Sequence, residues 1–288
     1  MKVVLFCGGQ GMRMKEYSES IPKPMVPVGP RPILWHIMKY YAHYGHNEFI
    51  LCLGHQGHVI KDYFLHYDEC LSNDFTLSCG SKQVELANRD LENWTIRFVD
   101  TGLNATIGQR LRVVRPLLQD DDIFMANYSD AVTDLNLPEL IQFFEDRDAV
   151  GVFVSIQPGQ SFHVVSSNDN NLVENIRPVG DLDIWINGGY FVFRRGIFDY
   201  IREGEELVAE PFQRLIAEKK LVTYKYQGFW TCMDTFKDRQ RLEDLYTRGE
   251  AAWQVWRCPR RGEPQAAEVL EEKGRPFFLD GEGRPCFV

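Results

Sequence analysis

The sequence predicts an α/β protein built on a doubly wound, mostly parallel mixed sheet with helices on both faces. Apolar "KVVLFC" at 2–7 is short, rich in β-branched residues and followed by glycines, as a buried parallel strand usually is. Strand-like and helix-like segments then alternate over the first 150 residues, which favours parallel strands joined by helices. From residue 149 strand-like segments dominate, so we expect the same sheet to continue with strands of both directions.

The first half alternates regularly between the two kinds of element. We expect a helix at 31–45 that ends at Gly45, a strand at 48–54, a helix at 58–67, strands at 95–102 and 122–130, and a helix at 137–146 capped by Asp134. Ligands of such sheets bind at the carboxyl ends of the strands. The polar residues that end the strand at 122–130 are therefore candidates for a site.

The second half has a different pattern. Segments "AVGVFVSI", "FHVVSS", "NLVENI" and "GGYFVFR" predict a mixed sheet over 149–235, with helices near 195–219 and 236–249. This sheet would supply the second wall of a cleft. The remainder, 257–288, is rich in glycine, proline and charge and is expected to be a C-terminal extension with a short helix at 264–272. We therefore expect one domain at 1–256, with halves at 1–148 and 149–256.

Composition excludes several classes of protein. With 288 residues and 44% hydrophobic content the chain can bury a substantial core. It has no apolar run of about 18 residues and no secretory signal, so we expect a cytoplasmic protein without a membrane partner. Seven scattered cysteines without a CxxC pair indicate neither a disulfide framework nor a zinc site. A net charge of −9 without a basic cluster argues against nucleic-acid binding.

A glycine loop follows the first strand in "FCGGQGMRM". Gly8, Gly9 and Gly11 can expose backbone amides to a phosphate, although a plain left-handed turn at the end of a strand is the alternative. Arg13 favours the anion site. A dinucleotide fingerprint is excluded because Met14 stands where its third glycine belongs, and a P-loop is excluded because the chain contains no Gly-Lys pair.

The loop and the segment after it resemble a known signature. "GGQGMRM" followed by "PKPMVPVGPRPIL" resembles the sugar-1-phosphate nucleotidyltransferases, the nucleotide-sugar pyrophosphorylases. "RPILWHIMKYYAHYG", "LCLGHQGHVIKDYF", "VDTG", "INGGYFV", "GFWTCMDT" and "AAWQVW" are similar to their glucose-1-phosphate cytidylyltransferase branch, in order, to about residue 256. The resemblance implies a Rossmann-like fold, a nucleotide-binding half at 1–148, an acceptor-binding half at 149–256 and a homo-oligomer.

The resemblance also implies a reaction and its catalytic residues. CMP would pass from CTP to a phosphorylated acceptor with release of pyrophosphate; UTP or dTTP are the next candidates. Because this is an in-line displacement between anions, cations must lie at the phosphates. Arg13 would brace the leaving β- and γ-phosphates, and Lys23, between two prolines, would offset charge along the reaction path. Asp130 and Asp234 would hold Mg²⁺. The alternatives are a solvated Lys23 and an Asp234 that only caps a helix.

Further residues are carried over as binding groups. The nucleotide would contact Gly8, Gly9, Gly11, Met12, Arg13, Arg110 and Ser129, and the acceptor would contact His163, Arg177, Asn187 and Gly188. For Arg110 an ordinary position on a helix surface is the alternative.

Several positions depart from the family pattern. Its Glu-Lys-Pro is Ile176-Arg177-Pro178 here, its Arg-Phe-Gly is Ser161-Phe162-His163, the Gly-Gly-Arg of the branch is Gly108-Gln109-Arg110, and the threonine of its glycine loop is Met12. These changes remove sugar-hydroxyl contacts but retain a cation for phosphate. We therefore expect a changed acceptor, either another sugar phosphate or a small phosphorylated or phosphonate compound. A regulatory subunit that binds nucleotide without turnover is the rival interpretation, and a dehydrogenase ranks below it.

Overall fold

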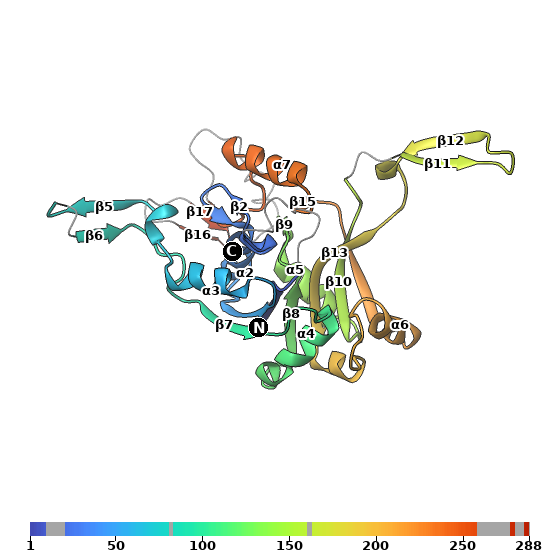
Figure 1. The fold of residues 1–288 in the computed structure, drawn as a ribbon, viewed down its shortest axis with the longest axis horizontal. Helices are drawn as coiled ribbons and strands as arrows, with labels where there is room; N and C mark the ends of the chain where they lie inside the picture. The colour runs from blue at the N-terminus through green and yellow to red at the C-terminus, as the bar shows by residue number, and fades with distance from the viewer. Residues whose placement is uncertain (10–20, 81–82, 160–162, 258–276, 280–284, 288) are drawn as a thin grey trace.

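A seven-stranded sheet forms the centre of the molecule (Figure 1). The computed structural model describes residues 1–9, 21–80, 83–159, 163–257, 277–279 and 285–287. The strand order across the sheet is β14-β10-β13-β8-β1-β4-β7. In chain order these strands are β1 (Val3–Phe6), β4 (Glu48–Leu53), β7 (Thr95–Asp100), β8 (Ile123–Asn127), β10 (Gly151–Ile156), β13 (Ile186–Arg194) and β14 (Leu221–Tyr226).

Strand directions match the predicted mixed sheet. Strand β1 lies between β4 and β8 and pairs with both in parallel, and β4 pairs with β7 in parallel. Strand β13 is antiparallel to β8 and β10, while β10 and β14 are parallel. Strands β10, β13 and β14 of the second half thus extend the sheet formed by the first half, as predicted. The prediction that "FHVVSS" and "NLVENI" belong to the same sheet is wrong, because in the described part of the chain β11 (His163–Ser167) and β12 (Val173–Pro178) pair only with each other.

Both faces of the sheet are buried, so the sheet is doubly wound. Successive side chains of a strand point to opposite faces. Val3 and Leu5 of β1 belong to one apolar cluster, whereas Val4 and Phe6 belong to the other. The first cluster includes side chains of α2 (Ile33–His43), α3 (Gly57–Leu65), α5 (Leu137–Glu145) and α7 (Phe236–Thr247). The second includes side chains of α4 (Ile107–Val114) and α6 (Glu210–Ala217).

Two local predictions about helix ends had different outcomes. Gly45 follows α2 with φ +82°, a left-handed conformation that glycine adopts without strain, so the predicted end of this helix is confirmed. The prediction that Asp134 caps α5 is wrong. Asn136 is the N-cap, because its side chain accepts a hydrogen bond from the Glu139 amide. Asp134 instead accepts a 2.9 Å hydrogen bond from the Phe229 amide.

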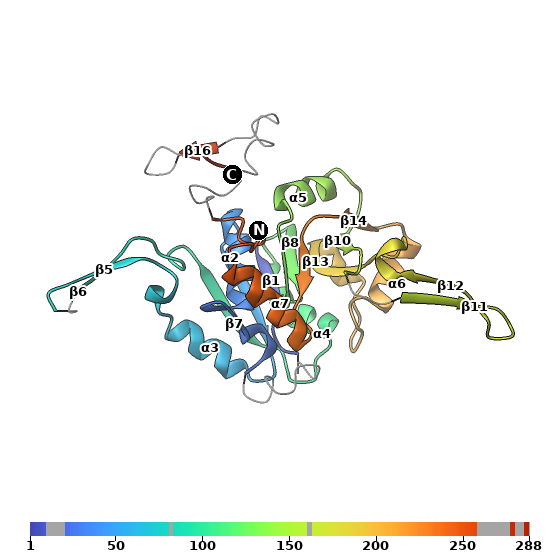
Figure 2. The same ribbon diagram turned by 90° about the horizontal axis from the view of Figure 1, so that it is seen from above.

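Short elements surround the central sheet. They are the paired strands β2 (Pro27–Val28) and β3 (Arg31–Pro32), β9 (Ala131–Thr133) and β15 (Trp230–Cys232), and β16 (Phe277–Leu279) and β17 (Pro285–Phe287). Two hairpins, β5 (Phe75–Ser78) with β6 (Gln83–Leu86) and β11 (His163–Ser167) with β12 (Val173–Pro178), extend from opposite ends of the molecule (Figures 1 and 2). The predicted helix at 264–272 lies outside the described residues. No helix in the described part of the chain is long and apolar enough for a bilayer span.

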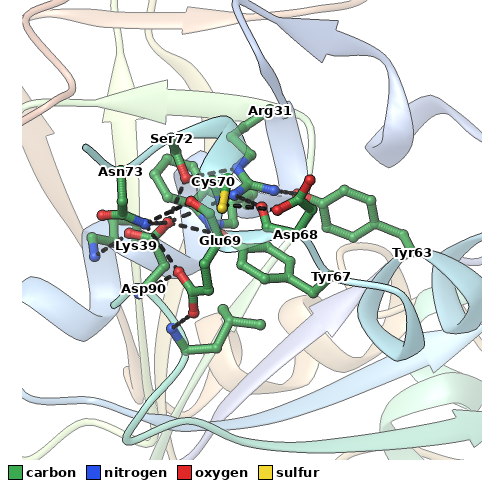
Figure 3. Close-up of polar contacts among 12 residues, drawn as sticks. Arg31, Lys39, Tyr63, Tyr67, Asp68, Glu69, Cys70, Ser72, Asn73 and Asp90 are labelled. Carbon is green, nitrogen blue, oxygen red and sulfur yellow. Dashed lines mark hydrogen bonds and ion pairs between the residues drawn. The ribbon is translucent and has the colours of Figure 1, made fainter. Parts of the chain in front are cut away.

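The segment before β5, which the sequence did not predict, is fixed to α2 by a buried polar cluster (Figure 3). Arg31 is 1% exposed and donates to the Asp68 carbonyl at 2.6 Å and to the Ser72 hydroxyl at 2.6 Å. The Asp90 carboxylate accepts from Ser72 at 2.5 Å and from Lys39 of α2 at 3.0 Å. Because buried charges are tolerated only when they are bonded, this cluster holds the segment in one position.

We predict that Asp90→Asn lowers the free energy of unfolding at pH 7 by about 2 kcal/mol, the usual cost of losing hydrogen bonds to a buried charge. Burial alone would raise the pKa of Asp90, but the hydrogen bonds from Ser72 and Lys39 outweigh it and lower that pKa. A carboxyl group whose pKa is lowered by folding stabilises the folded state at pH values above its pKa in the unfolded chain. This stabilisation is lost as the pH falls through the lowered pKa. The deficit of the variant should therefore shrink below about pH 4.

Urea unfolding of the wild type, Asp90→Asn and Asp74→Asn between pH 3 and 7 measures this effect. Asp74 is exposed and its variant is the control, with the same loss of charge outside the cluster. An Asp90→Asn deficit that stays constant with pH would contradict the assignment.

Candidate active site

Three of the predicted catalytic side chains meet at one point. The Lys23 ammonium lies 2.7 Å from the Asp130 carboxylate and also forms an ion pair with Asp234. Lys23 is 107 residues from Asp130 and 211 residues from Asp234 along the chain, so the meeting is a product of the tertiary fold. The predicted convergence of the two carboxylates is therefore present in the structure.

The pairing of β9 with β15 brings the two carboxylates together. Ala131 lies opposite Cys232 in this antiparallel pair, and the Met233 amide donates a 2.8 Å hydrogen bond to the Asp130 carbonyl. Asp130 immediately precedes β9 and Asp234 follows β15, so the register places them at the same end of the pair. The N-cap of α7 is Thr235, whose side chain bonds the Asp238 amide, and the role of cap therefore does not belong to Asp234.

Two prolines shape the backbone around Lys23. Pro22 is extended, with ψ 148°, and the turn η2 (Lys23–Met25) closes by a 2.8 Å hydrogen bond from the Met25 amide to the Pro22 carbonyl. Pro24 restricts φ within that turn. The Lys23 side chain is only 15% exposed, so it is not the solvated lysine of the alternative interpretation.

The charges of Lys23, Asp130 and Asp234 sum to −1, and this net negative charge shifts the pKa values of nearby groups. Burial alone would lower the pKa of Lys23, but Asp130 and Asp234 outweigh it and raise that pKa, so the ammonium stays charged. Burial, followed by the charges of Asp234 and Asp130, raises the pKa of the nearby Cys232 thiol to about 12. The site thus favours cations.

Asp130 and Asp234 are the carboxylates that fit a divalent ion. Both face the same cation, and Mg²⁺ prefers hard oxygen ligands while keeping positions for water and phosphate. Among the described residues no group of three or more His, Cys, Asp or Glu side chains could hold a metal by itself. Two carboxylates would leave a bound Mg²⁺ with coordination positions for water and phosphate oxygens.

The start of the glycine loop lies at the carboxyl end of β1, beside β8, whose own end leads to Asp130. Gly8 is buried and Gly9 is exposed, and a Cβ added to Gly9 would meet no atom of the described residues within 4 Å. This exposed backbone suits the approach of a phosphate. Gly11, Met12 and Arg13 lie outside the described residues, and their proposed contacts remain predictions.

Arg110 and Ser129, which were predicted to contact the nucleotide, are both buried. Arg110 is 3% exposed and donates to the Gly8 carbonyl at 3.0 Å, so it is not the surface residue of the alternative interpretation. Ser129 is fully buried, with φ +65°, and its amide donates to the Asn127 side chain at 2.7 Å. Arg110 thus bonds the residue that follows β1, and Ser129 bonds the last residue of β8.

The predicted acceptor residues separate into two groups. Asn187 is the second residue of β13 and donates to the Tyr128 hydroxyl at 3.2 Å, and the Gly188 carbonyl accepts from the Trp230 indole at 2.9 Å. These two residues therefore adjoin the segments that carry Asp130 and Asp234. His163 and Arg177 are exposed on β11 and β12, on the hairpin that extends from the body (Figure 1). The structure does not bring them to the Lys23 ammonium.

Sequence reasoning missed the aromatic residues that line this region. Tyr128 and Trp230 lie two and four residues from the predicted acids, and both bond the start of β13. No spacing rule identifies them, because their partners come from another part of the chain. The one feature of the sequence that pointed to them was their closeness to the predicted acids, in "SD" at 129–130 and "CMD" at 232–234.

Comparison with known proteins agrees with this geometry. The family model described as Nucleotidyl transferase matches residues 2–238. The chain belongs to this family. It is 35% identical over 258 residues to the glucose-1-phosphate cytidylyltransferases of Salmonella typhimurium and Salmonella typhi, covering 89% of this chain and 100% of each of theirs. The family resemblance read from the sequence is thereby confirmed, and the chain is a nucleotidyltransferase.

A solved structure shows a similar fold at low identity. UDP-glucose pyrophosphorylase in complex with UDP-glucose superimposes with a TM-score of 0.63 and 12% identity, over 86% of this chain and 98% of that chain. The predicted Rossmann-like mixed sheet of nucleotidyltransferase type is thus confirmed.

We predict that Lys23→Met lowers the free energy of unfolding by about 1 to 2 kcal/mol, because two carboxylates then face each other without a cation. The cost should be below that of a deeply buried pair, since Asp130 and Asp234 are 24% and 33% exposed. Adding Asp130→Asn to Lys23→Met should recover part of it.

Urea unfolding at pH 7 of the wild type, both single variants and the double variant measures the coupling. Effects that simply add would contradict a direct interaction.

Proposed function

We propose that this nucleotidyltransferase transfers CMP from CTP to a phosphorylated acceptor and releases pyrophosphate. An acceptor phosphate oxygen would attack the α-phosphorus of CTP, the bond from that phosphorus to the leaving oxygen would break, and pyrophosphate would depart. The observation that carries the proposal is the ion pairing of Lys23 with both Asp130 and Asp234, at strand ends beside the glycine loop.

Charge neutralisation is the main task of such a site. Lys23 keeps its proton because its pKa is raised, so a fixed positive charge is available for the phosphate oxygens. Asp130 and Asp234 would hold Mg²⁺, which supplies further positive charge to the triphosphate when bound. Arg13 would brace the departing pyrophosphate from the glycine loop.

The choice of CTP rests on the relatives. The two Salmonella proteins named as glucose-1-phosphate cytidylyltransferases match along their whole length, which makes cytosine the first base to test. UTP and dTTP follow as alternatives. The relatives also favour a sugar 1-phosphate as acceptor, and the same resemblance leads us to propose a homo-oligomer.

A divergent acceptor is the finer part of the proposal. Asn187 and Gly188 adjoin the site, whereas His163 and Arg177, which replace family residues, lie on the exposed hairpin of β11 and β12. An acceptor with fewer hydroxyls than glucose needs fewer of the contacts that this chain lacks. We therefore include small phosphates and phosphonates among the acceptors.

A matrix of nucleotides and acceptors tests the proposal. CTP, UTP and dTTP are each combined with Mg²⁺ and a panel of sugar 1-phosphates, small phosphates and phosphonates, and pyrophosphate is measured. We expect release with CTP and at least one acceptor. Asp130→Asn and Asp234→Asn should each lower kcat by about 100-fold or more, because each would remove a carboxylate ligand of the Mg²⁺ that neutralises the reacting phosphates.

Asp120→Asn is the matched control, since Asp120 is exposed and precedes β8, at the opposite end of that strand from Asp130, and it should keep wild-type activity. Nucleotide binding without pyrophosphate release for every combination would overturn the proposal and favour the regulatory subunit.

Metal binding provides a separate prediction. Lys23 and a divalent ion are attracted to the same carboxylates, so in the absence of nucleotide Lys23→Met should bind Mn²⁺ about tenfold more tightly than the wild type. Asp234→Asn should bind it more weakly than the wild type. Electron paramagnetic resonance of free Mn²⁺ measures both affinities, and equal affinity in all three proteins would exclude these carboxylates as metal ligands.

A further inference from the structure

We propose that Arg110 is a positioning residue for nucleotide binding that fixes Gly8, the residue at which the glycine loop begins. This inference rests on the proposed function, because it assigns the loop to the nucleotide. Arg110 belongs to α4 and reaches the carboxyl ends of the central strands from the second face of the sheet.

The guanidinium joins the ends of three neighbouring strands. It donates to the Gly8 carbonyl after β1 at 3.0 Å, to the Leu53 carbonyl at the end of β4 at 3.1 Å, and to the Thr101 hydroxyl after β7 at 2.6 Å. Strands β1, β4 and β7 are adjacent in the sheet. One side chain therefore sets the relative positions of three strand ends, and the glycine loop begins at the first of them.

Two glycines make room for this side chain. A Cβ on Gly8 would lie 2.1 Å from Nη1 of Arg110, far inside van der Waals contact. A Cβ on Gly54 would lie 2.7 Å from the Gly8 carbonyl oxygen and 3.0 Å from the same Nη1. Gly8 is thus required for the fit of Arg110, in addition to any approach of a phosphate.

The positive charge of Arg110 has no salt-bridge partner in the described part of the chain. Its bonded acceptors are the Thr101 hydroxyl and the backbone carbonyls of Gly8, Leu53 and, at 3.4 Å, Leu103. Burial lowers the pKa of Arg110, yet an arginine remains protonated at neutral pH. A cation buried beside the loop raises the local potential and favours a bound anion.

These bonds distinguish positioning from direct contact. The Nη atoms already donate to four protein oxygens, so the guanidinium acts on a nucleotide through Gly8 and through its field. The expected consequence is a change in nucleotide affinity without a comparable change in acceptor affinity.

Steady-state kinetics of the whole protein tests the inference. Arg110→Lys and Arg110→Ala should raise the KM for CTP by about tenfold or more and change the acceptor KM less than about twofold, because the support of Gly8, and in Arg110→Ala also the buried positive charge, is lost beside the nucleotide. Guanidinium ion at millimolar concentration should restore part of the CTP affinity of Arg110→Ala. Arg112→Gln is the control, since Arg112 is exposed on the same helix and should behave as the wild type.

A second pair of residues tests the route through Gly8. Gly8→Ala should weaken CTP binding strongly in the wild-type background, where the methyl group collides with Arg110. In the Arg110→Ala background the same change should cost less than about twofold, because the collision partner is gone. Independent, multiplying effects would overturn the inference.

Thr101→Val keeps the test decisive if Arg110→Ala does not fold. It removes the hydroxyl after β7 that accepts a hydrogen bond from Arg110. It should raise the KM for CTP by about threefold, again without changing the KM for the phosphorylated acceptor. An unchanged CTP KM in both Thr101→Val and Arg110→Lys would also overturn the inference. A wild-type protein that releases no pyrophosphate would instead refute the proposed function, and calorimetry of CTP binding then tests Arg110 separately.

Discussion

The ion pairing of Lys23 with Asp130 and Asp234 is the interaction on which the site depends. Two neighbouring carboxylates in a partly buried place repel each other, so a cation between them is needed to keep both of them ionised. Lys23 provides that cation from a turn fixed by two prolines, and β9 with β15 supplies the neighbouring acids. The site therefore exists only when three distant segments are docked together, so its assembly is coupled to the folding of the whole sheet.

The position of this interaction follows from the topology of the sheet. Strand β1 lies between β4 and β8, so the chain leaves β1 on one side and returns later on the other. At such a switch point the loops after adjacent strands diverge and leave room for a ligand. The glycine loop after β1 and Asp130 after β8 lie at that place. Arg110 contacts Gly8 from the second face of the sheet, while Lys23 forms ion pairs with Asp130 and Asp234.

Periodicity allowed most of the central sheet to be predicted, because buried strands such as Val3–Phe6 have a local signal. The acids were found because they follow apolar segments. The pairing of β9 with β15 has no such signal, since each strand has only three residues. Asp134 was wrongly assigned as a cap because Asn136 is an equally good cap by composition. The burial of Arg110 depends on Gly8 and Gly54, which follow other strands, so helix periodicity could not indicate it.

The two halves of the site differ in how firmly the fold holds them. Among the residues proposed for the nucleotide, Ser129 and Arg110 are buried and hydrogen bonded, so substitutions there disturb the sheet itself. Among those proposed for the acceptor, His163 lies on β11, every residue of which is exposed, and this strand pairs with β12. Exposed positions of a hairpin contribute little to the core and accept substitutions at small cost in stability. The fold thus allows His163 and Arg177 to differ from the family pattern while the Lys23 site is preserved, which is the physical basis for expecting a changed acceptor with an unchanged reaction.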